Sequence, residues 1–354
     1  MASVKNQPAT LCFSSMVEDI VFSTNAENGI LLLEIVHNGE RETILEETMY
    51  PSIDGTIVVS DLPELVEPYA RQYLRVKLEC SLTDAAGKAG ISPVTVLYSM
   101  ADVGESATAF TGHHFMTILD GEKMTAMGRR EQLSAYEVEA VTVIADVQLQ
   151  TGEYNTLSAE LHPFTTDTGI STFDVSPANV AALVGLVGGR LFGYTIEAGE
   201  RRQRYRVVED LTAPAPSLYF VNSFGCYELL HCVGTHKKDS KYERKSTRIK
   251  GRLKNYRTVE DRQFTANTGW LNQAMADWAD DLFRSETVLL WVGGEDGGPG
   301  REVVISDSKS EITNEDDHMP AFEFTYTYAQ RIHNVMEPTR AGRIFDNTFD
   351  HTFN

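Results

Sequence analysis

Short runs of alternating apolar and polar residues, separated by turn residues, fill roughly the first hundred positions of the chain. Successive strand side chains point to opposite faces of a sheet, so this alternation predicts half-buried strands. Asn38-Gly39 suits a two-residue hairpin turn, because both central positions need positive φ. So many short strands predict an immunoglobulin-like β-sandwich over residues 1–105. The predicted strands are Asp19–Thr24, Gly29–His37, Thr43–Met49, Thr56–Ser60, Tyr73–Ser81 and Val94–Met100.

Residues 106–212 predict a mixed β domain with one short helix. Ser176 is a favoured N-cap residue, Pro177 is tolerated at the first helical position, and Gly188-Gly189 is expected to end the helix. The Pro-containing segment 212–216 predicts a linker. The predicted strands of this domain are Phe115–Leu119, Glu137–Ala145, Thr156–Leu161, Leu191–Ile196 and Tyr205–Val208.

Residues 217–336 predict a third domain, rich in strands, with one amphipathic helix over Gly269–Arg284. Apolar side chains recur there at three- and four-residue spacing, and Asn267 or Thr268 can cap the helix start. The fold class is therefore predicted as mainly β with two helices, followed by a C-terminal extension or arm over 337–354. The predicted strands are Leu218–Asn222, Glu228–Gly234, a basic strand pair through Phe264, Val288–Val292, Glu302–Ser306 and Phe322–Ala329.

Composition narrows the class of protein. The chain carries 31 Lys and Arg against 51 Asp and Glu, a net charge of -20, which argues against a general nucleic-acid binder. No apolar run is long enough to span a bilayer and no apolar signal segment is visible, so neither membrane insertion nor export is expected. Four scattered cysteines fit a reducing cytosol better than a disulfide scaffold.

Candidate chemistry is sparse. Cys226, His231, Cys232 and His236 lie within eleven residues, but their spacing does not match a zinc knuckle, which favours structural packing. No nucleophile elbow, zinc-protease, P-loop or dinucleotide motif is present. We therefore expect no enzymatic activity, no catalytic or metal-binding residues and no cofactor.

A basic stretch is the clearest charge anomaly. Between His236 and Gln263 there are eleven Lys or Arg and four Asp or Glu, so the stretch is +7 and the rest of the chain is -27. Alternation predicts that Arg248, Lys250, Arg252 and Lys254 share one strand face. Three interpretations are open: a strand edge kept soluble by its charge, a contact with an acidic face of a neighbouring subunit, or a contact with nucleic acid.

The chain closes on a four-residue repeat, F-D-x-T-F-D-x-T-F-N, which carries Phe345, Phe349 and Phe353. Exposed phenylalanines are a liability unless a surface buries them. Two interpretations are open: the C-terminal extension folds back on its own domain, or it is anchored in a neighbouring subunit.

Several segments together resemble structural proteins of tailed-bacteriophage or prophage tails. They are Tyr-Phe-Val-Asn-Ser-Phe-Gly at 219–225, Ala-Asn-Thr-Gly at 266–269 leading into 276–285, the closing repeat and, more weakly, 115–123. The resemblance implies a virion subunit of the distal tail or baseplate that is made in the bacterial cytoplasm. Its implied partners are copies of itself, in a ring or sleeve, and neighbouring tail proteins. No functional residue is carried over.

A second class of function is also open. The N-terminal domain would be a carbohydrate-binding or adhesin module that recognises a host glycan, with Tyr50, Tyr69 and Tyr73 as its aromatic candidates. A third, a hydrolase acting on cell-surface polymer, has no motif to support it.

Overall fold

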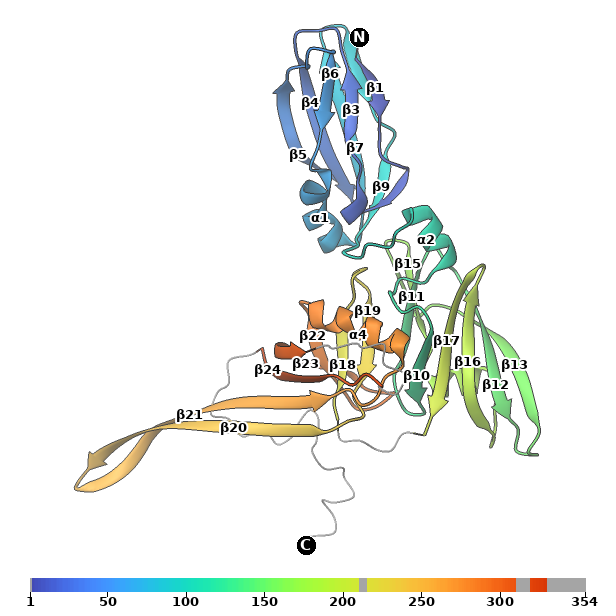
Figure 1. The fold of residues 1–354 in the computed structure, drawn as a ribbon, viewed down its shortest axis with the longest axis vertical. Helices are drawn as coiled ribbons and strands as arrows, with labels where there is room; N and C mark the ends of the chain where they lie inside the picture. Colours follow the sequence, from blue (N-terminus) through green and yellow to red (C-terminus); the bar gives the residue numbers. More distant parts are fainter. Residues whose placement is uncertain (1, 210–214, 310–318, 330–354) are drawn as a thin grey trace.

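The computed structural model describes residues 2–209, 215–309 and 319–329 (Figure 1). This part of the chain is mainly β, with five sheets and four α-helices, so the prediction of a mainly β fold is confirmed, while the prediction of two helices is wrong. Each sheet draws its strands from only one of the three predicted domains. The N-terminal sheets lie at one end of the molecule, and a two-stranded arm projects from the other end (Figure 1). None of the helices in the described ranges is long and apolar enough to cross a membrane.

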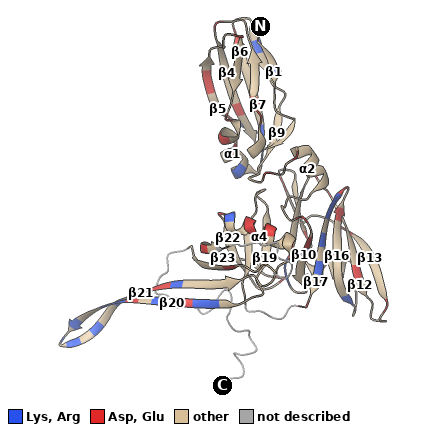
Figure 2. Ribbon diagram, in the orientation of Figure 1, with Lys and Arg blue, Asp and Glu red and all other residues tan. Residues whose placement is uncertain are grey.

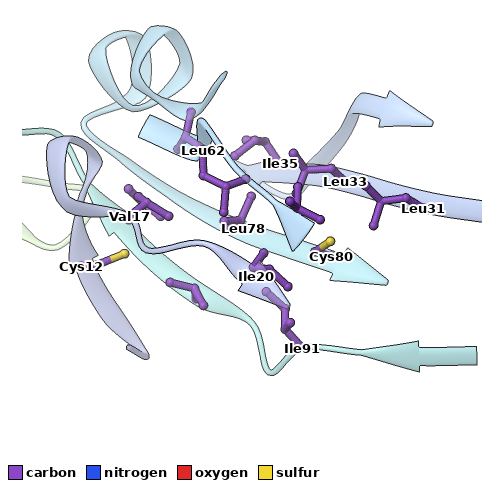
Figure 3. Packing of buried hydrophobic residues seen from close by; sticks show 14 of the residues in the cluster. Cys12, Val17, Ile20, Leu31, Leu33, Ile35, Leu62, Leu78, Cys80 and Ile91 are labelled. Atoms are coloured by element: carbon purple, nitrogen blue, oxygen red, sulfur yellow. The ribbon is translucent and has the colours of Figure 1, made fainter. Parts of the chain in front are cut away.

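The N-terminal part contains two sheets with a hydrophobic core between them. Figure 3 shows this core, to which both sheets contribute buried side chains, including Ile20 from one sheet and Leu33 and Leu78 from the other. The first sheet has the order β1 (Ser3–Asn6), β3 (Ile20–Ser23), β6 (Thr56–Val59). The second has the order β2 (Leu11–Phe13), β9 (Val94–Leu97), β7 (Arg75–Asp84), β4 (Gly29–His37), β5 (Glu40–Met49), with β8 (Gly87–Gly90) on β7 and a 3₁₀ turn at Ser14–Met16.

Local sequence explains most of these N-terminal strands. Strands lie at or close to all six predicted positions, and the predicted turn is confirmed, with φ of 48° at Asn38 and 83° at Gly39. The prediction missed helix α1 (Leu62–Tyr73) and was wrong to start a strand at Tyr73. Leu62, Val66 and Ala70 recur at four-residue spacing and are buried, so a helical period was present there.

The middle part begins with α2 (Ala107–His113), the second helix that the prediction missed, whose N-cap Ser106 accepts a hydrogen bond from the Ala109 backbone N–H. The predicted strand Phe115–Leu119 is wrong, because this segment is an irregular connection. Its Phe115, Met116 and Leu119 are buried, so a run of apolar residues was mistaken for strand alternation. Helix α3 (Pro177–Leu183) follows Ser176 as predicted but ends before Gly185, which has φ of 69°, rather than at Gly188-Gly189.

Two sheets make up the rest of this middle part. Five strands have the order β10 (Glu122–Ala126), β17 (Arg201–Val208), β16 (Arg190–Ala198), β12 (Val141–Gln148), β13 (Tyr154–Leu161), and β10 and β17 are parallel. Three strands have the order β11 (Gln132–Tyr136), β15 (Ile170–Asp174), β14 (Thr165–Asp167). Buried side chains of both sheets and of α3 form one core.

The third part is a seven-stranded sheet covered by helix α4 (Gln273–Arg284) (Figure 1). The fully buried Trp278 of α4 packs against Phe220, with ring centroids 5.8 Å apart. The helix starts four residues later than predicted, because Gly269 has φ of 75° and Asn272, not Asn267 or Thr268, caps it by accepting from the Met275 N–H. The strand order is β19 (Tyr227–His231), β18 (Ser217–Val221), β22 (Val288–Val292), β23 (Gly298–Lys309), β24 (Glu323–Tyr328), β21 (Arg252–Asn267), β20 (His236–Ile249).

Candidate interaction surface

Strands β20 and β21 form a long antiparallel hairpin, called the arm below, that extends well beyond the sheet from which it starts (Figure 1). On its inner side β21 pairs with β24 only from Phe264 to Asn267. Farther out, each of the two strands has a single neighbour, the other one. The outer part of the arm is therefore a two-stranded ribbon whose two edges are unpaired within the described residues.

Aromatic packing anchors the arm at its base. Phe264 of β21 stacks on Tyr326 of β24, with ring centroids 5.1 Å apart, and both side chains are buried. The His236 Nε2 atom lies 2.9 Å from the Tyr326 hydroxyl oxygen, within hydrogen-bond distance. These contacts fix where the arm leaves the sheet.

The proximal arm, defined as residues 236–243 and 258–267, is electrically balanced. It holds four cations (Lys237, Lys238, Lys241, Arg262) and four carboxylates (Asp239, Glu243, Glu260, Asp261). Arg262 donates two hydrogen bonds of 2.7 Å to Glu260, which lower the pKa of that carboxyl to about 2. Lys241 lies directly opposite Asp261 in the strand register. The positive and negative charges of the proximal arm therefore balance each other within the arm.

The distal arm, defined as residues 244–257, carries the whole charge excess of the basic stretch. It has seven Lys or Arg in 14 residues and no Asp or Glu. These cations colour the end of the arm in Figure 2. Lys245 lies directly opposite Arg257, and like charges at directly opposed positions destabilise a strand pair. The distal arm therefore lacks within itself the anions that would stabilise it. Its cations are Arg244, Lys245, Arg248, Lys250, Arg252, Lys254 and Arg257.

The predicted single-strand face of Arg248, Lys250, Arg252 and Lys254 is wrong. Arg248 lies at the end of β20, and Arg252 and Lys254 lie in β21. Lys250 lies in the turn between the strands, with φ of 53°, followed by Gly251 with φ of 78°. Arg248 is directly opposite Leu253, so these two side chains lie on the same face of the ribbon. Arg252 and Lys254 flank Leu253 and therefore lie on the other face. The alternating pattern of cations continues through the turn between the two strands, and Gly251 was the only local signal of that turn.

Apolar side chains lie exposed among these cations. The exposed fractions are 50% for Ile249, 71% for Leu253 and 63% for Tyr256. Tyr256 sits at an irregularity in the register between Lys245 and Ser246, where β21 has one extra residue. An exposed mixture of aromatic, aliphatic and cationic side chains is typical of a contact surface.

The four zinc candidates do not form a metal site in the structure. The His231 side chain is 7% exposed, its Nδ1 lies 2.7 Å from the Ser217 hydroxyl and its Nε2 lies 2.9 Å from the Arg130 carbonyl oxygen. Burial raises the pKa of both the Cys226 and Cys232 thiols to about 12, so they remain protonated. Over the described ranges no cluster of three or more His, Cys, Asp and Glu could hold a metal ion.

The remaining sequence candidates are separated or lie outside the described residues. Tyr69 and Tyr73 pack against the N-terminal core from α1, and Tyr73 stacks on His37 with centroids 3.7 Å apart. Only Tyr50 among the three tyrosines is exposed, so they do not form an aromatic platform. Phe345, Phe349 and Phe353 of the C-terminal extension lie outside the described residues.

Comparison with known proteins identifies no relative by sequence. No family model matches the chain, and no curated protein matches it. Among solved structures, a tetra-tandem repeat in the extending region of a large adhesion protein matches with a TM-score of 0.25 and 11% identity. That match covers 75% of this chain and 69% of the other. At this TM-score the match carries no argument about the fold or the function.

Proposed function

We propose that this chain is a non-enzymatic structural protein that assembles through its arm into a ring or sleeve, as a subunit of a bacteriophage tail. The observation that carries the proposal is the distal arm, which puts seven cations and three exposed apolar side chains at the end of a projecting ribbon. The rest of the chain has a net charge of -27, so copies of the same chain offer complementary surfaces. In this proposal the two N-terminal sheets are an immunoglobulin-like sandwich that forms part of the subunit wall.

The physical cost of the arm supports a role in assembly. A two-stranded ribbon alone is at best marginally stable in water, and ordering each backbone residue costs about 1–2 kcal/mol. The distal arm repays little of that cost within its own chain, because its residues are exposed and carry like charges. Docking on a partner would bury the apolar side chains and neutralise the cations. The identity as a tail component rests on the sequence resemblance.

Neutralising the arm is expected to weaken self-association and leave the fold intact. The test variant carries Gln at Arg248, Lys250, Arg252 and Lys254. Exposed charge pairs are worth about 0.2–1 kcal/mol each, so four of them predict association weaker by about 4- to 1,000-fold at low salt. The effect should shrink as salt rises, because exposed charges are screened over about 10 Å at 0.1 M. Sedimentation velocity across concentration and salt series measures this.

A matched control carries Gln at four exposed arginines of β16 and β17: Arg190, Arg202, Arg204 and Arg206. It removes the same charge from another surface and should associate as the unmodified chain does. Equal association of the arm variant and the unmodified chain at every salt concentration would assign the arm cations to a solvated edge. An unmodified chain that stays monomeric at all concentrations would contradict the structural role itself.

A further inference from the structure

Resting on the proposed function, we propose that the distal arm of one copy docks along edge strand β5 of a second copy. Figure 1 shows β5 and the arm in separate regions of the molecule, so this contact joins two copies rather than two parts of one. The arm of each copy would engage β5 of the next. Such a heterologous contact generates a closed ring when the rotation closes and a helical sleeve when it does not.

Strand β5 presents an open edge. It is the last strand of its sheet and pairs only with β4 among the described residues. It is ten residues long and mostly exposed. A long exposed edge strand carries a row of unpaired N–H and C=O groups, which is a template for pairing with another chain. The distal arm has unpaired edges of its own, so backbone hydrogen bonds can form between the two.

The charge on β5 is opposite to that on the distal arm. Residues 1–105 hold six Lys or Arg and sixteen Asp or Glu, a net charge of -10. Strand β5 alone contains four glutamates, Glu40, Glu42, Glu46 and Glu47, and Figure 2 shows this acidic strand on the outer side of the sheet. Its single cation, Arg41, is 2.7 Å from Glu34 and 2.8 Å from Glu79, so it is held by carboxylates of β4 and β7.

The two elements also match in length and in apolar content. At about 3.3 Å per residue, β5 is about 33 Å long, and each six-residue strand segment of the distal arm, 244–249 and 252–257, is about 20 Å long. The arm therefore fits within β5. Exposed Tyr50 and Ile53 follow the end of β5, where they can meet the exposed Leu253 and Tyr256 of the arm. Register is then set by charge pairs and by one apolar contact.

A charge swap tests this contact in the full chain. The arm variant carries Arg252→Glu, Lys254→Glu and Arg257→Glu, and the strand variant carries Glu40→Lys, Glu46→Lys and Glu47→Lys. Each alone opposes like charges and is expected to weaken self-association at least about 10-fold at low salt. An equimolar mixture should recover association, because the unmodified β5 of one variant fits the unmodified arm of the other and the two reversed surfaces fit each other.

The matched control carries Glu139→Lys, Glu153→Lys and Glu160→Lys. It makes the same charge change as the strand variant, at exposed sites of the middle part, and should leave association unchanged. If the arm variant loses association and the strand variant keeps it, β5 is not the partner of the arm, while the proposed assembly through the arm stands. Loss of association in both variants without recovery in the mixture would also overturn β5 as the partner. Assemblies of the unmodified chain that dissolve on nuclease treatment would overturn it as well. A chain that never associates would overturn both this inference and the proposed function.

Discussion

Replacing Lys123 with Met is expected to lower the free energy of unfolding by about 3–5 kcal/mol at pH 7. Lys123 lies on β10 and is only 2% exposed. Its Nζ donates to Glu131 Oε2 over 2.7 Å and to the Leu229 carbonyl oxygen over 2.9 Å. It also lies 4.3 Å from the ring centroid of Trp278. One ammonium group thus joins the middle sheets to both β19 and α4.

The large expected effect comes from the carboxylate left behind. Glu131 is fully buried, and burial alone raises its pKa, but Lys123 and the neighbouring His231 together outweigh burial, so the pKa is lowered to about 2. Burial lowers the pKa of His231, whose Nε2 is 3.4 Å from Glu131 Oε1, so a neutral imidazole cannot replace the lost ammonium. Without Lys123 a charged carboxylate would remain unpaired in the interior, which is costly.

Urea unfolding at pH 7 and pH 4 checks this prediction. A carboxyl with a lowered folded-state pKa contributes stability above its unfolded pKa, near 4.5, and loses it as the pH falls toward 2. In Lys123→Met that contribution is gone and Glu131 can protonate, so the stability difference from the unmodified chain should be smaller at pH 4 than at pH 7.

Two further variants make the result specific. Lys123→Met combined with Glu131→Gln should regain part of the loss, because it removes both charges. Arg202→Met breaks only the exposed ion pair with Glu197 and should cost less than about 1 kcal/mol. A loss below about 1 kcal/mol for Lys123→Met, or a double variant no more stable than the single one, would contradict the role of the buried pair.

Sequence reasoning succeeded where the signal is local. The alternation in Gly29–His37 and the turn at Asn38-Gly39 depend only on neighbouring residues, and both are present. Helix α4 was predicted from its apolar period, and its start was wrong because a positive φ at Gly269 is not visible in that period. Helix α1 was missed although Pro63 is near its start and its apolar spacing is helical.

Features that depend on distant contacts could not be predicted. Lys123 and Leu229 are 106 residues apart, and nothing near either one in the sequence signals that they meet. For the arm, composition gave the charge excess, but only the strand register separates the balanced proximal half from the cationic distal half. No sequence motif marks β5 as an edge strand, because its position at the edge depends on the order of all the strands in the sheet.

Removing the distal arm is expected to abolish assembly while the monomer keeps its fold. Arg244 pairs with Thr258 across the arm, so residues 245–257 can be replaced by Asn-Gly, which suits a two-residue hairpin turn. The deletion removes six of the seven distal cations and the exposed Ile249, Leu253 and Tyr256. The core of the third part, including Phe264, Tyr326 and Trp278, is untouched, so the melting temperature of the monomer should change little.

The molar mass of this shortened chain in solution, measured by light scattering beside the unmodified chain, tests the central claim most directly. We expect the unmodified chain to form species larger than a monomer whose mass falls as salt rises. The shortened chain should have the mass of a monomer, with an unchanged thermal transition, at every concentration and salt. A shortened chain that forms the same large species as the unmodified one would contradict assembly through the arm.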